Sequence, residues 1–517
     1  MYDYVIVGGG SAGCVLAARL SEDPETSVCL IEAGGADSSP DIHVPAAFGK
    51  LFRTAVDWDY DTHDEVHLDR RRVYLPRGRV LGGTSSINTM IYIRGHRADF
   101  DGWGVPGWTY RELLPYFLRS EDNERGASAF HATGGPLAVS DGRSRNPMSE
   151  AFVAAAVEAG HPHNEDFNGA EQDGFGAFQL TQRNGMRAST ATAFLRPAQN
   201  RPNLTVRTHV QVHRVLVEGG RAVGVTGRCL DTDVTIRAER EVILSAGAYN
   251  SPQLLLLSGV GPAKALGAFG LPVVADLPEV GANLQDHLLV PLIYTHPHPV
   301  SLLAAAAPRN VGLFERFRRG PLTSNGPEAG GFVRTKDDLD RPDVEFLCAP
   351  VMFADNGLGA PTDHAVSFGP SMLAPRSRGH VALASPDPTA KPRITHSYVA
   401  EKADLQDAVT ALRTALRIAE QPAFVDFTET PFRPPASDSD ADLAQYVRSY
   451  AHSIYHPAST CAIGPVVDAH LRVHGVDGLR VADASVMPRL VSGNPNAATI
   501  ALAEKAADLL RGLPPAV

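Results

Sequence analysis

The chain opens with alternating blocks of apolar residues and glycines. A short apolar run at residues 4–7 is followed at once by the glycine-rich turn 8–13, and apolar residues then recur at helical spacing. A second apolar run at residues 28–31 ends at Glu32. This order of strand, glycine turn, helix, strand and acid predicts a βαβ unit that binds a dinucleotide, although an ordinary tight turn between strand and helix is the alternative.

Each part of this unit has an expected task. The glycines of the turn are Gly8, Gly10 and Gly13. Their backbone N–H groups, together with the positive end of the following helix, can hold a pyrophosphate that side chains at these positions would push away. The Glu32 carboxylate stands where it can take both hydroxyls of an adenosine ribose.

Residues 203–247 form a second patterned region, rich in strand-forming residues. Two apolar-rich runs flank Gly219–Gly220, which predicts a hairpin with a two-residue turn. A helix is expected to begin at Ser251, with Pro252 in its first turn and Gly259 as its end.

The remaining pattern mixes strands and helices. Residues 343–353 and 379–386 predict strands, and residues 403–421 predict a long amphipathic helix. Near the C-terminus, a strand over 478–485 precedes a loop rich in glycine, asparagine and proline and a final helix over 496–513. Because no linker or repeat separates these segments, we expect a mixed α/β fold whose domains are interleaved along the chain.

Composition favours an enzyme that acts on a small molecule. The 517 residues, 44% of them hydrophobic, can bury two cores with a cleft between them. The net charge of −11 argues against a nucleic-acid partner. The 5 cysteines are odd in number and lack metal-ligand spacing, so we expect reduced core thiols and no metal site.

No transmembrane or secretory segment is predicted. No apolar stretch approaches the roughly 18 residues that a membrane helix needs, so we expect no integral membrane segment. The first strand begins almost at Met1, which leaves no room for a secretory signal. A cytoplasmic location is therefore the expectation.

Four segments together resemble the glucose–methanol–choline oxidoreductases, and the choline-dehydrogenase-like bacterial branch in particular. They are GRVLGGTSSINTMIYIRG (78–95), GAYNSPQLLLLSGVG (247–261), YHPAST (455–460) and LRVADASVMPRLVSGNPNAATIALAEKAADLL (479–510). The resemblance extends over nearly the whole chain. It implies FAD as the cofactor and the oxidation of an alcohol, expected to be a primary alcohol, to a carbonyl compound.

The resemblance also implies how the chain divides into domains. A Rossmann-like FAD-binding domain would comprise residues 1–155, 200–290 and 460–517. A substrate-binding domain, built on an antiparallel sheet with helices, would comprise residues 156–199 and 291–459. The two domains are thus expected to be interleaved, as the pattern of elements also indicates.

Cofactor contacts are carried over residue by residue from the resemblance. They are Gly8, Gly10, Ser11, Ala12, Gly13, Glu32, Ala33, Arg79, Gly82, Gly83, Ser86, Asn88, Val212, Ala246, Gly247, Asp483, Ala484, Asn496 and Ala497. Among them, Val212 would pair with the adenine through its backbone, and Asp483 would hold the ribityl chain. On sequence alone, ordinary strand core for Val212 and a turn cap for Asp483 are alternatives.

The glycine and hydroxyl residues of the first motif support a flavin site independently. Two adjacent glycines followed by Thr84, Ser85 and Ser86 offer close backbone approach and hydroxyl donors, although a plain serine and glycine turn is the alternative. Some family members attach FAD covalently through a histidine immediately before Asn88. Here that position is Ile87, whose alkyl side chain cannot form the bond. Non-covalent FAD is therefore expected.

His456 and Asn496 are the candidate catalytic residues. Alcohol oxidation requires a base for the hydroxyl proton, and a neutral imidazole titrates in the useful range. In the family, the histidine of YHPAST faces the flavin N5, and its partner some forty residues later is histidine or asparagine. Asn496 matches the partner, and it is also placed to cap the last helix, whose positive end would favour negative charge on the reduced flavin.

Several questions stay open at this level. Choline, aromatic and aliphatic alcohols, sugars and polyols remain possible substrates, and either O2 or an electron carrier remains possible as the acceptor. The aromatic candidates for a pocket are Trp58, Tyr60, Tyr92, Phe353 and Tyr455, and Glu328 is a nearby acid that we expect to be solvated. Alternative functions are a flavin-dependent lyase or light-driven decarboxylase, and a non-catalytic flavoprotein. The oligomeric state is not predicted.

Overall fold

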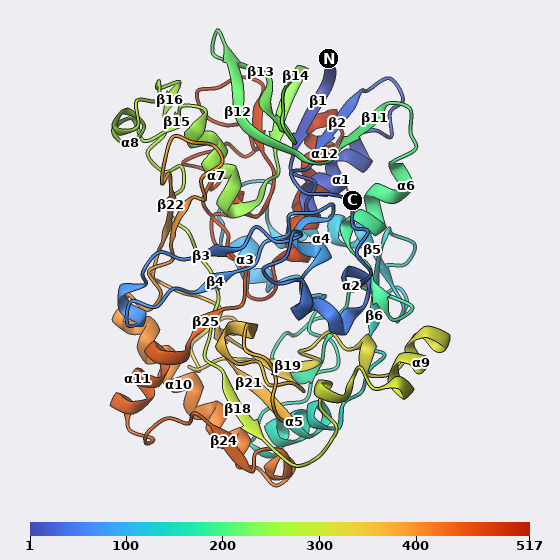
Figure 1. Cartoon of the computed structure of the whole chain (residues 1–517), viewed down its shortest axis with the longest axis vertical. Helices are drawn as coiled ribbons and strands as arrows, with labels where there is room; N and C mark the ends of the chain where they lie inside the picture. Colours follow the sequence, from blue (N-terminus) through green and yellow to red (C-terminus); the bar gives the residue numbers. More distant parts are fainter. Residues whose placement is uncertain (517) are drawn as a thin grey trace.

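The computed structural model describes residues 1–516 and is organised around two sheets, shown at the top and bottom of Figure 1. The first sheet has seven strands in the order β11-β2-β1-β14-β13-β12, with β26 also paired to β14. The strands are β1 (Tyr2–Val7), β2 (Val28–Ile31), β11 (Leu204–Arg207), β12 (Val210–Glu218), β13 (Arg221–Cys229), β14 (Thr232–Leu244) and β26 (Leu479–Val481). The expected α/β fold class is thus confirmed.

The parallel part of this sheet explains the first apolar runs of the chain. β1 pairs in parallel with both β2 and β14, and Val5 and Ile6 are fully buried because the sheet is covered on both faces. Helix α1 (Ser11–Leu20) follows β1 and packs against α12 (Asn496–Arg511). An ion pair of 2.8 Å between Arg19 and the buried Glu504 joins the two helices.

The second sheet has eight strands and is antiparallel. Its main order is β24-β18-β21-β20-β19-β7, and β17 and β25 pair with one another beside β21. The strands are β7 (Gly174–Ala177), β17 (Leu288–Leu289), β18 (Leu292–Thr295), β19 (Ala329–Val333), β20 (Val344–Ala349), β21 (Ala365–Met372), β24 (Thr430–Phe432) and β25 (His452–Ser453). The helices that pack beside this sheet are α5 (Pro147–Glu158), α10 (Lys402–Ala419) and α11 (Asp440–Tyr450).

Alternate side chains of β20 point to the two faces of the second sheet, one against the core and the other against a cavity. Phe346 and Cys348 lie in the core that α5 and α10 share with the sheet. Leu347 and Ala349 alternate with them and line a cavity on the opposite face. One face of the sheet is therefore structural, and the other is available to a ligand.

Shorter elements connect the two sheets. The helices are α2 (Pro40–His43), α3 (Arg97–Asp101), α4 (Tyr110–Ser120), α6 (Arg196–Ala198), α7 (Gly247–Leu257), α8 (Ala263–Ala268) and α9 (Pro308–Phe317). The strands are β3 (Tyr60–Asp61), β4 (Tyr74–Leu75), β5 (Glu121–Asn123), β6 (Leu137–Asp141), β8 (Gln179–Leu180), β9 (Gln182–Arg183), β10 (Met186–Arg187), β15 (Val260–Gly261), β16 (Ala275–Asp276), β22 (His380–Ala382) and β23 (Arg393–Thr395).

Most of the elements expected from the pattern are present. Gly219 and Gly220, with φ of 58° and 81°, form the turn of the β12–β13 hairpin, as predicted. The predicted strands within 343–353 and 379–386 are β20 and β22, and the predicted long amphipathic helix is α10. The domain boundaries remain a prediction.

Helix α7 starts at Gly247 instead of Ser251, so Pro252 lies inside it and not in its first turn. Proline has no N–H to give to the carbonyl four residues back, which belongs to Ala248. The Thr460 hydroxyl donates to that carbonyl oxygen at 2.7 Å instead. A hydroxyl from a distant segment thus permits a helix that the local sequence did not indicate.

The cysteines fit the expectation only in part. All 5 are free, and four of them are buried, but Cys229 at the end of β13 is partly exposed.

Residues 1–516 contain no helix long and apolar enough to cross a membrane. The same residues contain no group of three or more potential metal-ligating side chains.

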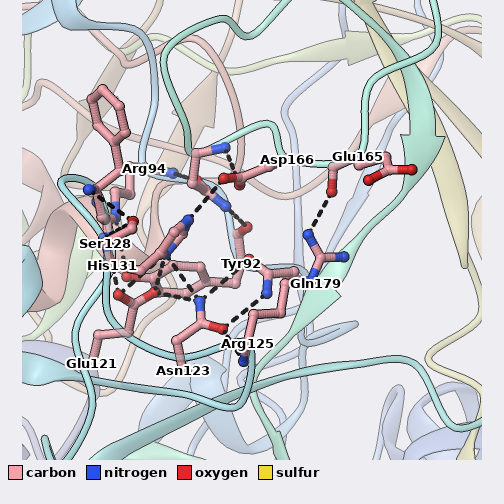
Figure 2. Close-up of polar contacts among 12 residues, drawn as sticks. Tyr92, Arg94, Glu121, Asn123, Arg125, Ser128, His131, Glu165, Asp166 and Gln179 are labelled. Carbon is pink, nitrogen blue, oxygen red and sulfur yellow. Dashed lines mark hydrogen bonds and ion pairs between the residues drawn. The ribbon is translucent and has the colours of Figure 1, made fainter.

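A buried polar network fixes the segment that follows β5 (Figure 2). Arg94 Nη2 lies 2.9 Å from Glu121 Oε2, and both side chains are buried. His131 contacts Glu121 through Nδ1 at 3.1 Å and Asp166 through Nε2 at 2.9 Å. These contacts hold residues 121–132 against Arg94. Arg94 follows Ile91, which lines the cavity described below, by three positions along the chain.

Candidate active site

A cavity of about 500 Å³ is lined by residues of both sheets. At one end it is lined by the carboxyl ends of β1 and β2 and by β12. At the other end it is lined by residues of β20 and β21 and by the segment around His456. The carboxyl edge of a parallel sheet is the usual location of a ligand in such folds.

The glycine turn at the start of α1 forms one wall of this cavity. An added Cβ at Gly10 would meet protein atoms only at 3.9 Å, so it would project into the cavity and not into the fold. Gly8 and Gly13 are constrained by the protein itself, because a Cβ on Gly13 would strike the Gly8 carbonyl oxygen. No side chain caps α1, which leaves its first N–H groups free for an anion.

Glu32 lies where the adenosine end of a dinucleotide is expected. Its Oε2 accepts a hydrogen bond from Gly9 N–H at 2.9 Å, and its Oε1 accepts one from Gly34 N–H at 2.8 Å. Burial raises the pKa of this carboxyl to about 7. Each carboxyl oxygen retains capacity for a further donor, and Val212 lines the cavity beside it.

Asp483 organises the middle of the cavity. Its Oδ2 accepts from Gly247 N–H at 2.9 Å and from the Ser251 hydroxyl at 2.5 Å, and its Oδ1 accepts from Ser485 N–H at 2.8 Å. The carboxylate thus holds the first turn of α7 against β26. Backbone groups of Ala246 and Gly247 consequently border the cavity.

The predicted cofactor residues, taken together, fall into two groups according to whether they line the cavity. Those that line the cavity are Gly8, Gly10, Ser11, Ala12, Glu32, Ala33, Arg79, Gly83, Asn88, Val212, Ala246, Gly247, Asp483, Ala484 and Asn496. The residues that do not line it are Gly13, Gly82, Ser86 and Ala497. Ser86 donates to Leu81 O at 2.7 Å and so shapes the loop from behind.

Arg187 supports the loop that contains Ser85 and Asn88, and it was not identified from the sequence. Its Nη1 donates to Asn88 Oδ1 at 2.9 Å and to Ser85 O at 3.1 Å, and its Nε donates to Ile42 O. Burial lowers the pKa of this guanidinium to about 9. The sequence offers little sign of this role, because Arg187 lies far along the chain from Ser85 and Asn88 and has no acidic residue beside it.

His456 lies at the opposite end of the cavity from Glu32 and is buried. Its Nε2 is 3.1 Å from Asn494 Nδ2, and its Nδ1 is 3.0 Å from His287 Nδ1. Burial, and next the proximity of His287 and Arg77, lower the pKa of His456 well below the usual value, so the ring is neutral. Because an amide N–H of Asn494 donates to Nε2, the ring proton belongs on Nδ1, where His287 can accept it.

Asp286 binds the backbone N–H groups of both histidines. Its Oδ1 accepts from His287 N–H at 2.9 Å and from His456 N–H at 2.8 Å. Its Oδ2 accepts from the hydroxyls of Tyr398 and Ser453, both at 2.5 Å. The turn that carries His456 is therefore fixed by a fully bonded carboxylate.

Family models match both ends of the chain. A GMC oxidoreductase N-terminal model matches residues 2–289, and a GMC oxidoreductase C-terminal model matches residues 375–503. The chain belongs to the GMC oxidoreductase family. It is accordingly an FAD-dependent enzyme that oxidises the CH–OH group of alcohols.

Curated relatives of this GMC enzyme match it over nearly the whole length. An alcohol dehydrogenase [acceptor] of Pseudomonas putida is 42% identical over 99% of this chain and 96% of its own. An oxygen-dependent choline dehydrogenase of Paraburkholderia phymatum is 44% identical over 99% of this chain and 93% of its own. Neither name is that of a lyase or a binding protein, so those alternatives find no support.

Solved GMC structures superpose on the whole molecule. Pyridoxine 4-oxidase from Mesorbium loti matches with a TM-score of 0.91 at 33% identity, covering 99% of both chains. Formate oxidase of Aspergillus oryzae matches with a TM-score of 0.92 at 28% identity, covering 99% of this chain and 98% of its own. The cavity described above therefore lies in a fold that holds FAD.

The structure places Asn494, not Asn496, in hydrogen-bond contact with the GMC motif histidine His456. Asn496 lines the cavity as the first residue of α12, and its Oδ1 accepts from the Ser11 hydroxyl at 2.7 Å. It makes no side-chain cap of its own helix. Asn496 thus joins the starts of α1 and α12, whereas Asn494 contacts His456.

The aromatic candidates also divide. Trp58, Tyr60, Phe353 and Tyr455 line the cavity, but Tyr92 does not and lies in the network of Figure 2. The interpretation of Glu328 as a solvated acid is wrong. It is 8% exposed, and its Oε2 accepts from Asn146 N–H at 3.0 Å, away from the cavity.

Proposed function

We propose that His456 is the base that takes the hydroxyl proton of a primary alcohol bound between His456 and Asn494. The observation that carries this proposal is the neutral, buried imidazole whose Nε2 lone pair is directed at an amide in the cavity wall. A neutral imidazole in this tautomer accepts a proton without first losing one. His287 would hold the Nδ1 proton while Nε2 accepts the second.

Asn494 is proposed to position the substrate oxygen. Its Nδ2 now donates to His456 Nε2, and its Oδ1 has no hydrogen-bond partner. An alcohol placed between the two residues can accept from Nδ2 and donate to Nε2. The amide would thus hold the oxygen while the hydroxyl proton moves to the imidazole.

The residues that line the cavity fit FAD, with the pyrophosphate at Gly10 and the adenosine ribose at Glu32. When bound, FAD supplies the hydride acceptor of the reaction. We propose that it is held without a covalent bond, because Ile87 lines the cavity at the linking position. After acid precipitation the yellow colour should remain in the supernatant, and colour in the pellet would contradict this.

The five free cysteines also fit a reducing compartment, so a cytoplasmic location is part of the proposal. As acceptor, either O2 or an electron carrier would reoxidise the flavin.

An anaerobic alcohol panel tests the proposed activity. Mixing the FAD-loaded protein with primary alcohols should bleach the visible flavin band, and admission of an acceptor should restore it. A carboxylic acid of matched size is the control, since it has no carbinol hydrogen to transfer. If no alcohol bleached a fully loaded protein, the proposed function would be wrong.

A further inference from the structure

The substrate end of the cavity has a strongly apolar wall. The residues of this wall are Phe48, Phe52, Leu289, Pro291, Pro327, Leu347, Ala349, Val351, Phe353 and Phe368. The hydroxyls in the wall are already committed: Ser367 donates to Val351 O at 2.6 Å, and Ser453 donates to Asp286. Burial lowers the pKa of His452, the second histidine of the wall, to about 4, so this ring is neutral.

Three carboxylates line the cavity, and each accepts hydrogen bonds from protein donors. Glu32 and Asp483 lie at the cofactor positions described above. Asp57 is the third, and four donors surround it: Oδ1 accepts from Asp59 N–H at 3.0 Å and Arg77 N–H at 2.9 Å, and Oδ2 accepts from Arg53 N–H at 2.9 Å and the Tyr74 hydroxyl. No carboxylate of the cavity, among residues 1–516, is left to pair with a substrate cation.

On the cavity side of His456 the nearby charge is positive, because the Asp286 carboxylate, which binds the His456 backbone N–H, does not line the cavity. Arg77 lines the cavity, and its Nη2 donates to the carbonyl oxygen of Tyr455, the neighbour of His456, at 2.8 Å. Asp286 and Asp57 are the acids whose charges act on this guanidinium, and neither lies within ion-pair distance of it in the described residues. Its charge would repel a cation placed against His456 and attract the negative charge that develops on an alcohol oxygen as the proton leaves.

We infer that the enzyme acts on neutral primary alcohols with an apolar body and rejects quaternary ammonium alcohols such as choline. This inference rests on the proposed function and narrows it, because the names of the relatives leave both kinds of alcohol open. A cation in this wall would lose its hydration without gaining a counter-charge. The aromatic faces that line the cavity would replace only part of that hydration; they belong to Trp58, Tyr60, Phe353, Phe368 and Tyr455.

A pair of alcohols with the same shape tests the inference directly. Choline and 3,3-dimethylbutan-1-ol differ in that a quaternary carbon replaces the quaternary nitrogen, so size is matched and charge is not. For the FAD-loaded enzyme, kcat/KM for the neutral alcohol should exceed that for choline by about 100-fold or more. Equal values, or a preference for choline, would overturn the inference.

Measurements of alcohol binding without turnover test this inference independently of the proposed activity. Dissociation constants of both alcohols are measured under anaerobic conditions from the perturbation of the flavin spectrum. If neither alcohol were oxidised but the neutral one bound more tightly, the proposed function would fail and the inferred preference of the cavity for a neutral alcohol would stand. Tighter binding of choline would overturn the inference whatever the turnover.

Matched variants at Arg77 test the source of the discrimination. Arg77→Met removes the charge and keeps much of the apolar stem, whereas Arg77→Lys keeps the charge. The ratio of kcat/KM values, neutral over cationic, should fall about 10-fold in Arg77→Met and persist in Arg77→Lys. An unchanged ratio in a folded, FAD-loaded Arg77→Met would remove Arg77 from the argument, and the isosteric pair in the unmodified enzyme would still decide the inference.

Discussion

The Nδ1 atoms of His456 and His287 lie 3.0 Å apart, with the two rings nearly perpendicular at 84°. Both rings are neutral, because burial lowers the pKa of His287 to about 4 and that of His456 well below its usual value. One neutral ring must donate to the other, and because the Asn494 amide donates to His456 Nε2, the donor in this contact is His456 Nδ1. Contacts with His287 and Asn494 thus leave Nε2 as the nitrogen that would accept the proton in the proposed reaction.

This relationship predicts the pH dependence of flavin reduction. A base acts in its neutral form, and a lowered pKa keeps His456 neutral throughout the neutral range. The rate of anaerobic flavin reduction by an alcohol should therefore be constant above about pH 6.5 and fall only at lower pH. Rapid mixing across this range measures it. A rate that rose between about pH 7 and 8 would indicate a different base.

The two asparagines of the last motif form a matched pair. Asn494→Ala removes the amide beside His456, so we expect flavin reduction to slow by about 10²-fold, with FAD retained. Asn496→Ala removes the bond to Ser11, so we expect a smaller effect on that rate and a larger loss of FAD. Stopped-flow reduction and the flavin-to-protein ratio distinguish them. The reverse order of effects would return the substrate-positioning role to Asn496.

Gly10→Val should produce protein without FAD. The new side chain would occupy the cavity beside the free N–H groups of α1, where the pyrophosphate is expected. The variant should melt lower than the loaded enzyme, because FAD stabilises the folded state to which it binds. The control is Gly267→Val, where an added Cβ meets nothing within 4 Å. Full FAD occupancy in Gly10→Val would refute this placement of the dinucleotide.

The fold and one end of the cavity were predictable because local patterns determine them. The glycine turn, the acid after β2 and the hairpin at Gly219–Gly220 each depend on a few adjacent residues with special backbone freedom. The surroundings of His456 depend on His287, Asp286 and Arg77, which only tertiary packing brings to it. No spacing in the sequence connects them.

The choice between Asn494 and Asn496 shows the same limit at short range. Only Pro495 separates them, and the difference arises because α12 begins at Asn496 and the Asn496 side chain contacts Ser11. Helix α7 is a further example, since its early start depends on a hydroxyl from Thr460. Helix boundaries of this kind depend on partners far along the chain.

His131 should make the stability of the protein sensitive to alkaline pH. Burial opposes its charge, but the hydrogen bonds to Asp166 and Glu121 outweigh burial and raise its pKa to about 9. Since this pKa lies above that of the unfolded chain, the stabilisation is complete below about pH 6.5 and is lost as the pH rises through about 9.

His131→Gln tests this by thermal melting of the loaded enzyme. The difference in Tm between the unmodified enzyme and the variant should be largest near pH 6 and shrink toward about pH 9.5. The exposed His67 provides the control variant His67→Gln, which should show no such change. A difference that grew with pH would contradict the assignment of a protonated His131.

Flavin reduction by His456→Ala is the measurement that tests the central claim most directly. The variant retains the cofactor end of the cavity, so it should bind FAD as the unmodified enzyme does. Under anaerobic conditions, alcohol should reduce its flavin about 10²–10⁴-fold more slowly, the range for loss of an acid–base group. A near-normal rate in the fully loaded variant would remove His456 from the chemistry.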